Sequence, residues 1–335
     1  MAPEIWFAAS HEEFPPSQLI EQAVAAAAAG FEGTSCSDHF APWFPDGQSG
    51  SALVWLGAAG RAVERGPLGT SVTPVIHRYH PAIIAQAFMT LAELFPGRAF
   101  LGAGSGEALN EDPLGLDWPA PEQMLARFDS GLEAIRRLWA GETVTMDGGW
   151  FRLREAKLYT RAASPPKLYV SAFGPRAARI AARHGDGLWT VGDPDKAPRV
   201  IDAYRRACDE LGRAPGRIIL QGSFAWAQDE QQAIAGAKRW KPTLMPEVYS
   251  KDIHEPQEMQ RLADREISDE QYAQGAIISA DPDEHVERLR RLAGLGADVI
   301  VLQLVGQADP MGTIRTYGER VLPAVREALG AGSAS

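Results

Sequence analysis

The sequence has few cysteines and no excess of positive charge. Only Cys36 and Cys208 occur among 335 residues, and their spacing suits neither a disulfide framework nor a cysteine-based metal site. The 33 lysines and arginines are outnumbered by 43 acidic residues, which gives a formal net charge of −10. This balance argues against nucleic acid or an anionic membrane as a partner, so a small-molecule substrate is expected.

Long apolar runs and linkers are also missing. No stretch approaches the roughly 20 apolar residues of a membrane helix, and no basic segment precedes the strand-like residues that follow Met1. We therefore expect a cytoplasmic protein, without a metal ion. No repeat or Pro/Gly-rich linker divides the chain, so we expect a single domain over residues 1–330 and a disordered tail over 331–335.

The chain contains a regular alternation of short apolar strands and helical segments. Alternation over the whole length favours a parallel α/β sheet, and a count of eight strands favours a closed (β/α)8 TIM barrel. Two insertions are expected near the C-terminal face, a hairpin at about 142–153 and a helical segment at about 241–275. The expected strands cover residues 4–9, 33–37, 69–75, 99–101, 168–170, 187–189, 218–224 and 299–304.

Chemically active side chains follow the second expected strand. This strand ends at Asp38 and His39, with Trp43 close behind, and the C-terminal ends of barrel strands form the active sites of such folds. A neutral imidazole can accept a proton near pH 7, so His39 is a candidate general base. Taken alone, the Asp-His pair is equally consistent with a structural histidine in a loop.

Two glycine-containing loops follow other strands. The loop that starts at Gly102 fails the dinucleotide pattern, because Glu107 stands where the third glycine is required. It presents Glu107 and Asn110 at a strand end, although Glu107 could instead cap the next helix. The loop at 171–176 opens a helix whose free N–H groups favour an anion such as phosphate; an ordinary strand-to-helix turn is the alternative.

Four stretches together resemble the coenzyme F420-dependent glucose-6-phosphate dehydrogenases of the luciferase-like flavin and deazaflavin superfamily. The resemblance is specific in the N-terminal third and weakest between residues 193 and 275. It implies a (β/α)8 barrel, a homodimer and coenzyme F420 (8-hydroxy-5-deazaflavin) as cofactor. It also implies hydride transfer between the deazaflavin C5 and a hydroxyl or carbonyl carbon of a sugar, alcohol or related metabolite. The stretches are Ser37–Trp43, Leu68–Pro74, Pro81–Ala87 and Phe100–Glu111.

The resemblance carries roles onto individual residues. His39 matches the family's catalytic base, Trp43 the indole that helps to stabilise the reacting centre, and Glu107 the acid that serves the reduced ring. Substrate-binding positions fall on Thr190, Lys251 and Arg261. A non-prolyl cis peptide is implied between the first two residues of the cofactor set. The cofactor-binding positions are Ser71, Val72, Thr73, Asp38, Asn110, Phe173, Gly174, Arg176 and Ala177.

The substrate region departs from the family pattern. The glucose-6-phosphate enzymes hold the phosphate with a Thr-x-x-Lys element and with a lysine and an arginine of the insertion. Thr190 is kept here, but Asp193 or Pro194 stands at the lysine position and Gln274 or Gly275 at that of the arginine. We therefore expect that glucose 6-phosphate is not the preferred substrate.

Three alternatives remain open from the sequence. The first is a glucose-6-phosphate dehydrogenase whose phosphate site is rebuilt from Lys251 or Arg261. The second is an FMN-dependent luciferase-like monooxygenase, and the third is a barrel that binds the cofactor without catalysis. The presence of His39, Trp43 and Glu107 together argues against the last two.

Overall fold

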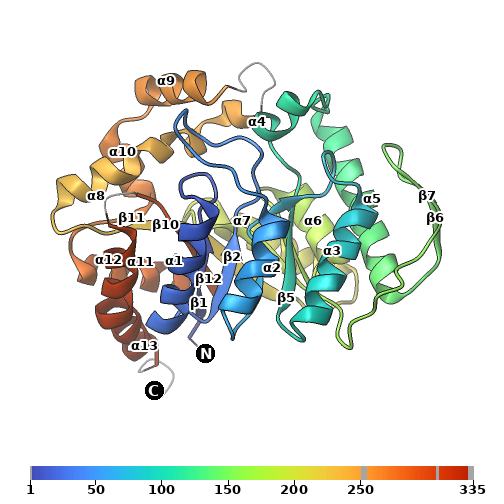
Figure 1. The fold of residues 1–335 in the computed structure, drawn as a ribbon, viewed down its shortest axis with the longest axis horizontal. Helices are drawn as coiled ribbons and strands as arrows, with labels where there is room; N and C mark the ends of the chain where they lie inside the picture. Colours follow the sequence, from blue (N-terminus) through green and yellow to red (C-terminus); the bar gives the residue numbers. More distant parts are fainter. Residues whose placement is uncertain (1, 250–254, 307–308, 331–335) are drawn as a thin grey trace.

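The structure, a computed structural model, describes residues 2–249, 255–306 and 309–330 (Figure 1). Lys251 and the tail 331–335 lie outside the described residues. No helix in the described ranges is long and apolar enough to span a bilayer.

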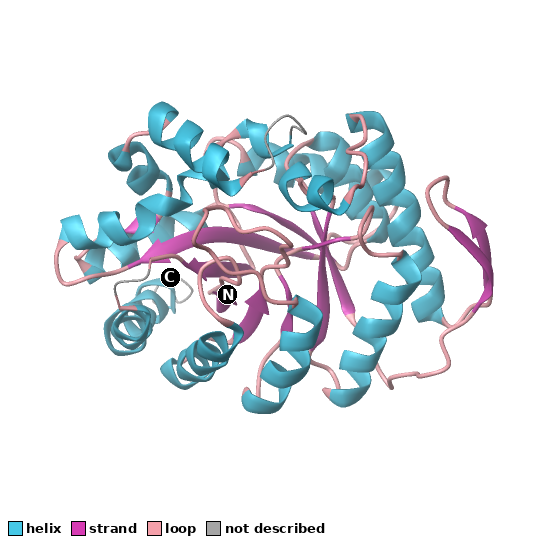
Figure 2. Cartoon of the chain, turned by 45° about the horizontal axis from the view of Figure 1, so that its top comes forward, coloured by secondary structure: helices cyan, strands magenta, loops and turns pink. Residues whose placement is uncertain are grey.

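Parallel strands form the closed barrel that the sequence predicts (Figure 2). The ring closes because β10 pairs with both β9 and β12, and β12 pairs with β1. Its strands are β1 (Glu4–Ala9), β2 (Gly33–Cys36), β3 (Leu68–Thr70), β5 (Ala99–Gly104), β8 (Lys167–Ser171), β9 (Gly187–Val191), β10 (Arg217–Ala225) and β12 (Val299–Leu304).

The predicted strand boundaries differ most from the structure at two places. The expected strand 69–75 is split, because β3 ends at Thr70 and the two-residue β4 (Thr73–Pro74) pairs separately with β5. The strand expected at 99–101 continues to Gly104, so the first half of the glycine-rich segment is strand rather than loop. A further short strand, β11 (Ile277–Ile278), pairs with β10.

Helices surround the barrel and connect successive strands (Figure 1). The sequence predicts α1 closely because Pro16 occupies its first turn and Gly30 ends it in the left-handed conformation at φ 103°. The surrounding helices are α1 (Pro16–Ala29), α2 (Ala52–Ala62), α3 (Pro81–Leu94), α5 (Pro121–Ala140), α6 (Pro175–His184), α7 (Ala197–Glu210), α11 (Pro282–Gly294), α12 (Pro310–Thr316) and α13 (Leu322–Gly330).

Large side chains fill the barrel interior. Trp6 and Phe100 lie with ring centroids 5.1 Å apart, and Tyr169 and Trp189 pack against Phe100. A separate and larger apolar cluster lies between the strands and the helices. The interior is therefore a packed core, and functional groups are confined to the strand ends.

Two segments interrupt the alternation of barrel strands and helices. The antiparallel hairpin of β6 (Val144–Asp147) and β7 (Arg152–Ala156) lies beside α5 and ends three residues later than expected. The helical insertion begins at Glu230 rather than at 241. We define "the insertion" as its described residues: α8 (Glu230–Ala237), the 3-10 turns Lys238–Leu244 and Pro246–Tyr249, α9 (Pro256–Glu266) and α10 (Asp269–Gly275).

Candidate active site

The imidazole of His39 lies at the C-terminal end of β2 between two carboxylates. Its Nε2 is 3.3 Å from Oε1 of Glu12 and 3.5 Å from Oε2 of Glu107. Its Nδ1 lies 3.2 Å from the Ala41 carbonyl oxygen and 3.2 Å from Nδ2 of Asn110. A proton on Nδ1 suits the carbonyl, which leaves Nε2 as the nitrogen that can exchange a proton.

Glu12 is a site residue that the sequence reasoning missed. It is almost completely buried, and its Oε2 accepts a 2.5 Å hydrogen bond from Oγ of Ser37. The Ser37 hydroxyl in turn accepts from the backbone N–H of His11 at 3.0 Å. The only available signal was its place just after the first strand, because every strand of a barrel ends at the same face.

Trp43 contacts His39 and belongs to the apolar core of the insertion. The two rings lie 5.0 Å apart between centroids, at an angle of 54°. Trp43 and Phe44 share one buried cluster with Trp240 and other insertion residues, and the rings of Phe44 and Trp240 meet edge to face at 5.6 Å. The insertion therefore packs on the loop that carries the imidazole.

Asp38 is held by three side chains. Its Oδ1 accepts from Nη2 of Arg78 at 2.8 Å and from the Tyr79 hydroxyl at 3.2 Å, while its Oδ2 accepts from Thr73 at 2.8 Å. Arg78 also pairs with the buried Glu111 at 3.1 Å. Burial, followed by the charge of Asp38, raises the pKa of Tyr79 to about 12, so its phenol stays a donor. These hydrogen bonds and ion pairs hold the Asp38 carboxylate in place, next to His39 in the chain.

Glu107 points into the site instead of capping the short helix α4 (Ala108–Glu111), because its side chain makes no capping hydrogen bond. Burial raises the pKa of Glu107, because the ionised carboxylate loses solvation when it is removed from water. The carboxamide of Asn110 donates to Glu107 at 3.1 Å and accepts from the N–H groups of Phe40 and Ala41. Asn110 thus links the ends of β2 and β5.

The segment between β3 and β4 contains the implied cis peptide. The bond between Ser71 and Val72 is cis. The Ser71 hydroxyl oxygen is buried and has no hydrogen-bond partner among the described residues. Val72 is partly buried against the barrel interior. An apolar face beside an unsatisfied hydroxyl fits a flat, polar-edged ring such as a deazaflavin.

The loop after β8 offers a second fit to a cofactor. Gly174 stands at the N-cap of α6 without a capping side chain, so N–H groups of the first turn remain open to an anion. Phe173 before it is 57% exposed. Ala177 follows in the first turn, and Arg176 pairs with Glu122 of α5 at 3.2 Å.

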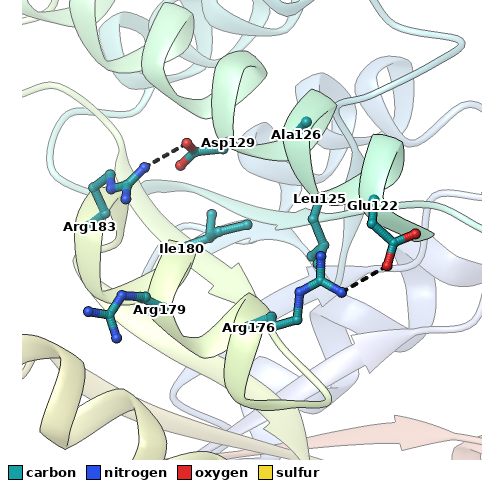
Figure 3. Close-up of a pocket in the computed structure, with 8 residues that line it drawn as sticks. All are labelled: Glu122, Leu125, Ala126, Asp129, Arg176, Arg179, Ile180 and Arg183. Atoms are coloured by element: carbon teal, nitrogen blue, oxygen red, sulfur yellow. Dashed lines mark hydrogen bonds and ion pairs between the residues drawn. The ribbon is translucent and has the colours of Figure 1, made fainter. Parts of the chain in front are cut away.

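Arg176 also borders a surface hollow of about 320 Å³ between α5 and α6, shown in Figure 3. Ion pairs such as that of Arg183 with Asp129 cross it, so its arginines already have acidic partners.

Two of the three predicted substrate residues, Thr190 and Arg261, lie in the described part of the chain. Thr190 is buried on β9. Arg261 is exposed on α9, where its Nε donates to the Gln257 carbonyl of the same helix at 3.3 Å. Lys251 lies outside the described residues.

Comparisons with known proteins agree with the fold and the motifs. The model of the luciferase-like monooxygenase family matches residues 2–299. An F420-dependent glucose-6-phosphate dehydrogenase of Nakamurella multipartita is 40% identical over 335 residues, which cover 97% of each chain. Its counterpart in Microbacterium testaceum is 37% identical over 327 residues, covering 96% of this chain and 97% of that one.

A solved structure shows the same likeness. It is described as an F420-dependent secondary alcohol dehydrogenase in complex with an F420-acetone adduct, and it is 31% identical with a TM-score of 0.92. The match covers 97% of this chain and 100% of that one. The chain therefore belongs to the luciferase-like monooxygenase family and, within it, to the family of the F420-dependent glucose-6-phosphate dehydrogenases.

Proposed function

We propose that the protein is an F420-dependent oxidoreductase that transfers a hydride between the deazaflavin C5 and a hydroxyl or carbonyl carbon. The observation that carries this proposal is the position of His39 Nε2, within 3.5 Å of two carboxylates at the barrel mouth. The relatives' dependence on F420 and the likeness to a dehydrogenase solved with an F420-acetone adduct support the same reaction class.

His39 acts as the general base in alcohol oxidation. With its Nδ1 proton donated to the Ala41 carbonyl, Nε2 accepts the proton of the substrate hydroxyl. The resulting imidazolium is stabilised by the carboxylate of Glu12, because its Oε1 already lies 3.3 Å from Nε2. In ketone reduction the same nitrogen returns the proton. A base of this kind contributes about 10²–10⁴-fold to the rate.

The remaining site residues hold the cofactor and the reacting centre. F420 supplies, when bound, a carbon that accepts or donates hydride and reacts poorly with oxygen. Ser71 would donate a hydrogen bond from its unsatisfied hydroxyl to the edge of the ring, and Val72 would offer it an apolar face. Glu107, whose pKa burial raises, holds a proton near the reduced ring.

Other groups act around this centre. Trp43 packs against His39 and supports the reacting centre, while Thr190 lines the substrate side. The open first turn of α6 takes the cofactor's anionic side chain, bordered by Phe173, Gly174, Arg176 and Ala177. Asp38, Thr73 and Asn110 position the walls of the ring site.

A comparative titration tests the cofactor assignment. The purified protein is titrated with F420 and with FMN by fluorescence quenching, and oxygen uptake is followed with each reduced cofactor. We expect tighter binding of F420 and no substrate-dependent oxygen uptake. Preferential binding of FMN together with oxygen consumption would instead establish the monooxygenase alternative. Tight F420 binding without reduction by any alcohol would indicate a non-catalytic binding protein.

We propose three further properties. Residues 1–330 form one domain, which is supported by the buried cluster shared between the insertion and the loop after β2. The protein is a homodimer, as the resemblance implies, and light scattering after gel filtration measures this. It is cytoplasmic, in keeping with two buried free cysteines.

A further inference from the structure

Buried acidic side chains outnumber buried cationic ones around His39. Arg78 is the arginine that faces this cluster, and both carboxylates that it contacts already balance it. An additional anion would therefore meet a surplus of negative charge in a poorly solvated site. The buried acidic side chains are Glu12, Asp38 and Glu111, and the partly buried Glu107 lies beside them.

Two cations of the insertion are likewise held by acidic partners. Arg239 pairs with Asp46, and its guanidinium lies 3.7 Å from the centre of the Phe44 ring. The buried Lys241 pairs with Asp269 at 2.5 Å and Asp264 at 3.6 Å. Moving either cation toward a ligand would leave these carboxylates without their ion pairs. Neither is therefore available to bind a phosphate dianion at low cost.

The segment after β9 carries a fixed negative charge. Asp193 accepts from the backbone N–H groups of Asp195 at 2.9 Å and Lys196 at 3.1 Å. Although burial acts in the other direction, these hydrogen bonds lower the pKa of Asp193, so it is ionised at neutral pH. Lys196 is turned onto the same carboxylate at 3.3 Å. The strand end that carries Thr190 thus presents no unpaired cation among these residues.

Apolar side chains are exposed on the loops of this face. Phe40 follows His39 and is 51% exposed, Phe173 follows β8, and Val191 ends β9. Tyr249 of the insertion is also exposed. Phe40 adjoins His39 in the chain and Tyr249 lies near Glu107, so these two can offer apolar surface to a ligand of the site.

We propose that the substrate is an uncharged alcohol or ketone with an apolar flank, and that phosphorylated sugars are excluded by charge. This inference rests on the proposed function, because it concerns the same site and the same hydride transfer. The alcohol loses a hydride from its carbon to F420 and a proton from its hydroxyl to His39, which yields the ketone and reduced cofactor. Among the described residues, the charges around His39 and on the segment after β9 carry this inference.

The test compares matched substrates in anaerobic F420 reduction. Glucose and glucose 6-phosphate differ only in the phosphate, while 2-propanol and cyclohexanol are small and uncharged. We expect kcat/KM for the two alcohols to exceed that for glucose 6-phosphate by at least about 100-fold. We expect glucose 6-phosphate to be no better than glucose, and not to inhibit alcohol oxidation at millimolar concentration.

Two outcomes are informative in different ways. If glucose 6-phosphate is at least tenfold more efficient than glucose, the inference is wrong while the proposed function stands. In that case the variants Lys251→Ala and Arg261→Ala would show which residue binds the phosphate. Our expectation is that neither variant changes the ratio of kcat/KM for glucose 6-phosphate to that for glucose. If bound F420 is reduced by none of the four compounds, the proposed function is wrong, and this inference is wrong as well because it rests on that function.

Discussion

The indole Nε1 of Trp240 donates a 2.8 Å hydrogen bond to Oε2 of the buried Glu13, which joins the insertion to the segment after β1. The same carboxylate oxygen accepts from the backbone N–H of Gly306 after β12 at 2.9 Å. Glu13 is also the chain neighbour of Glu12, which contacts His39. One side chain therefore connects three segments around the barrel mouth.

We predict that Glu13 makes stability fall as pH rises. Burial raises the pKa of Glu13 from 4.5 to about 7, although hydrogen bonds from Gly306 and Trp240 act in the other direction. The folded protein then binds more protons than the unfolded chain between these pH values, so the free energy of unfolding decreases across that window, by roughly 3 kcal/mol. Urea denaturation at pH 5 and pH 7.5 measures this. The Glu13→Gln variant should lack this pH dependence of the free energy of unfolding. A variant whose free energy of unfolding changes with pH as in the wild type would contradict the assignment.

We predict that Glu12→Gln lowers kcat by about 10- to 100-fold, because the imidazolium loses one adjacent negative charge. Cofactor affinity should stay near the wild-type value. Glu21→Gln, on the exposed face of α1, is the matched control. An unchanged kcat in the Glu12 variant would show that the contact has no catalytic consequence.

We predict that Arg78→Met destabilises the protein by about 3–5 kcal/mol, since Asp38 and Glu111 would lose the cation buried between them. Equilibrium unfolding in urea is the measurement. Arg137→Met removes a surface ion pair with Glu142 and should cost less than about 1 kcal/mol. Equal losses in the two variants would argue against a special role of the buried pair.

We predict that Ser71→Ala separates cofactor binding from stability. The hydroxyl is buried without a partner in the described part of the chain, so its removal should leave the melting temperature of the cofactor-free protein unchanged or raise it. The Kd for F420 should rise about tenfold, which corresponds to one lost hydrogen bond. An unchanged Kd would remove Ser71 from the cofactor site.

Much of the barrel was predictable because local signals agree with the fold. Apolar strands alternate with helices, and α1 has both a proline at its start and Gly30 at its end. His39 and Glu107 were predicted as site residues because motifs surround them, and the structure places their side chains 3.5 Å apart. The cis bond at Ser71 was implied only by resemblance, since no local pattern distinguishes it.

The differences have physical causes. Glu12 stands in a short polar segment after β1 without a motif, and its role depends on a contact with His39, 27 positions later in the chain. The start of the insertion was placed too late because the weakly amphipathic α8 resembles an ordinary barrel helix. Pairing of Lys241 with Asp269 is a long-range arrangement that composition does not reveal.

The central claim is that His39 is the base of an F420-dependent hydride transfer. The most direct test follows the bleaching of the visible F420 band under anaerobic conditions with a saturating alcohol, for the wild type and for His39→Ala. We predict that the wild type bleaches the cofactor, and that the variant does so about 10²–10⁴-fold more slowly while binding F420 with nearly the same Kd. A variant that turns over at the wild-type rate would contradict the account.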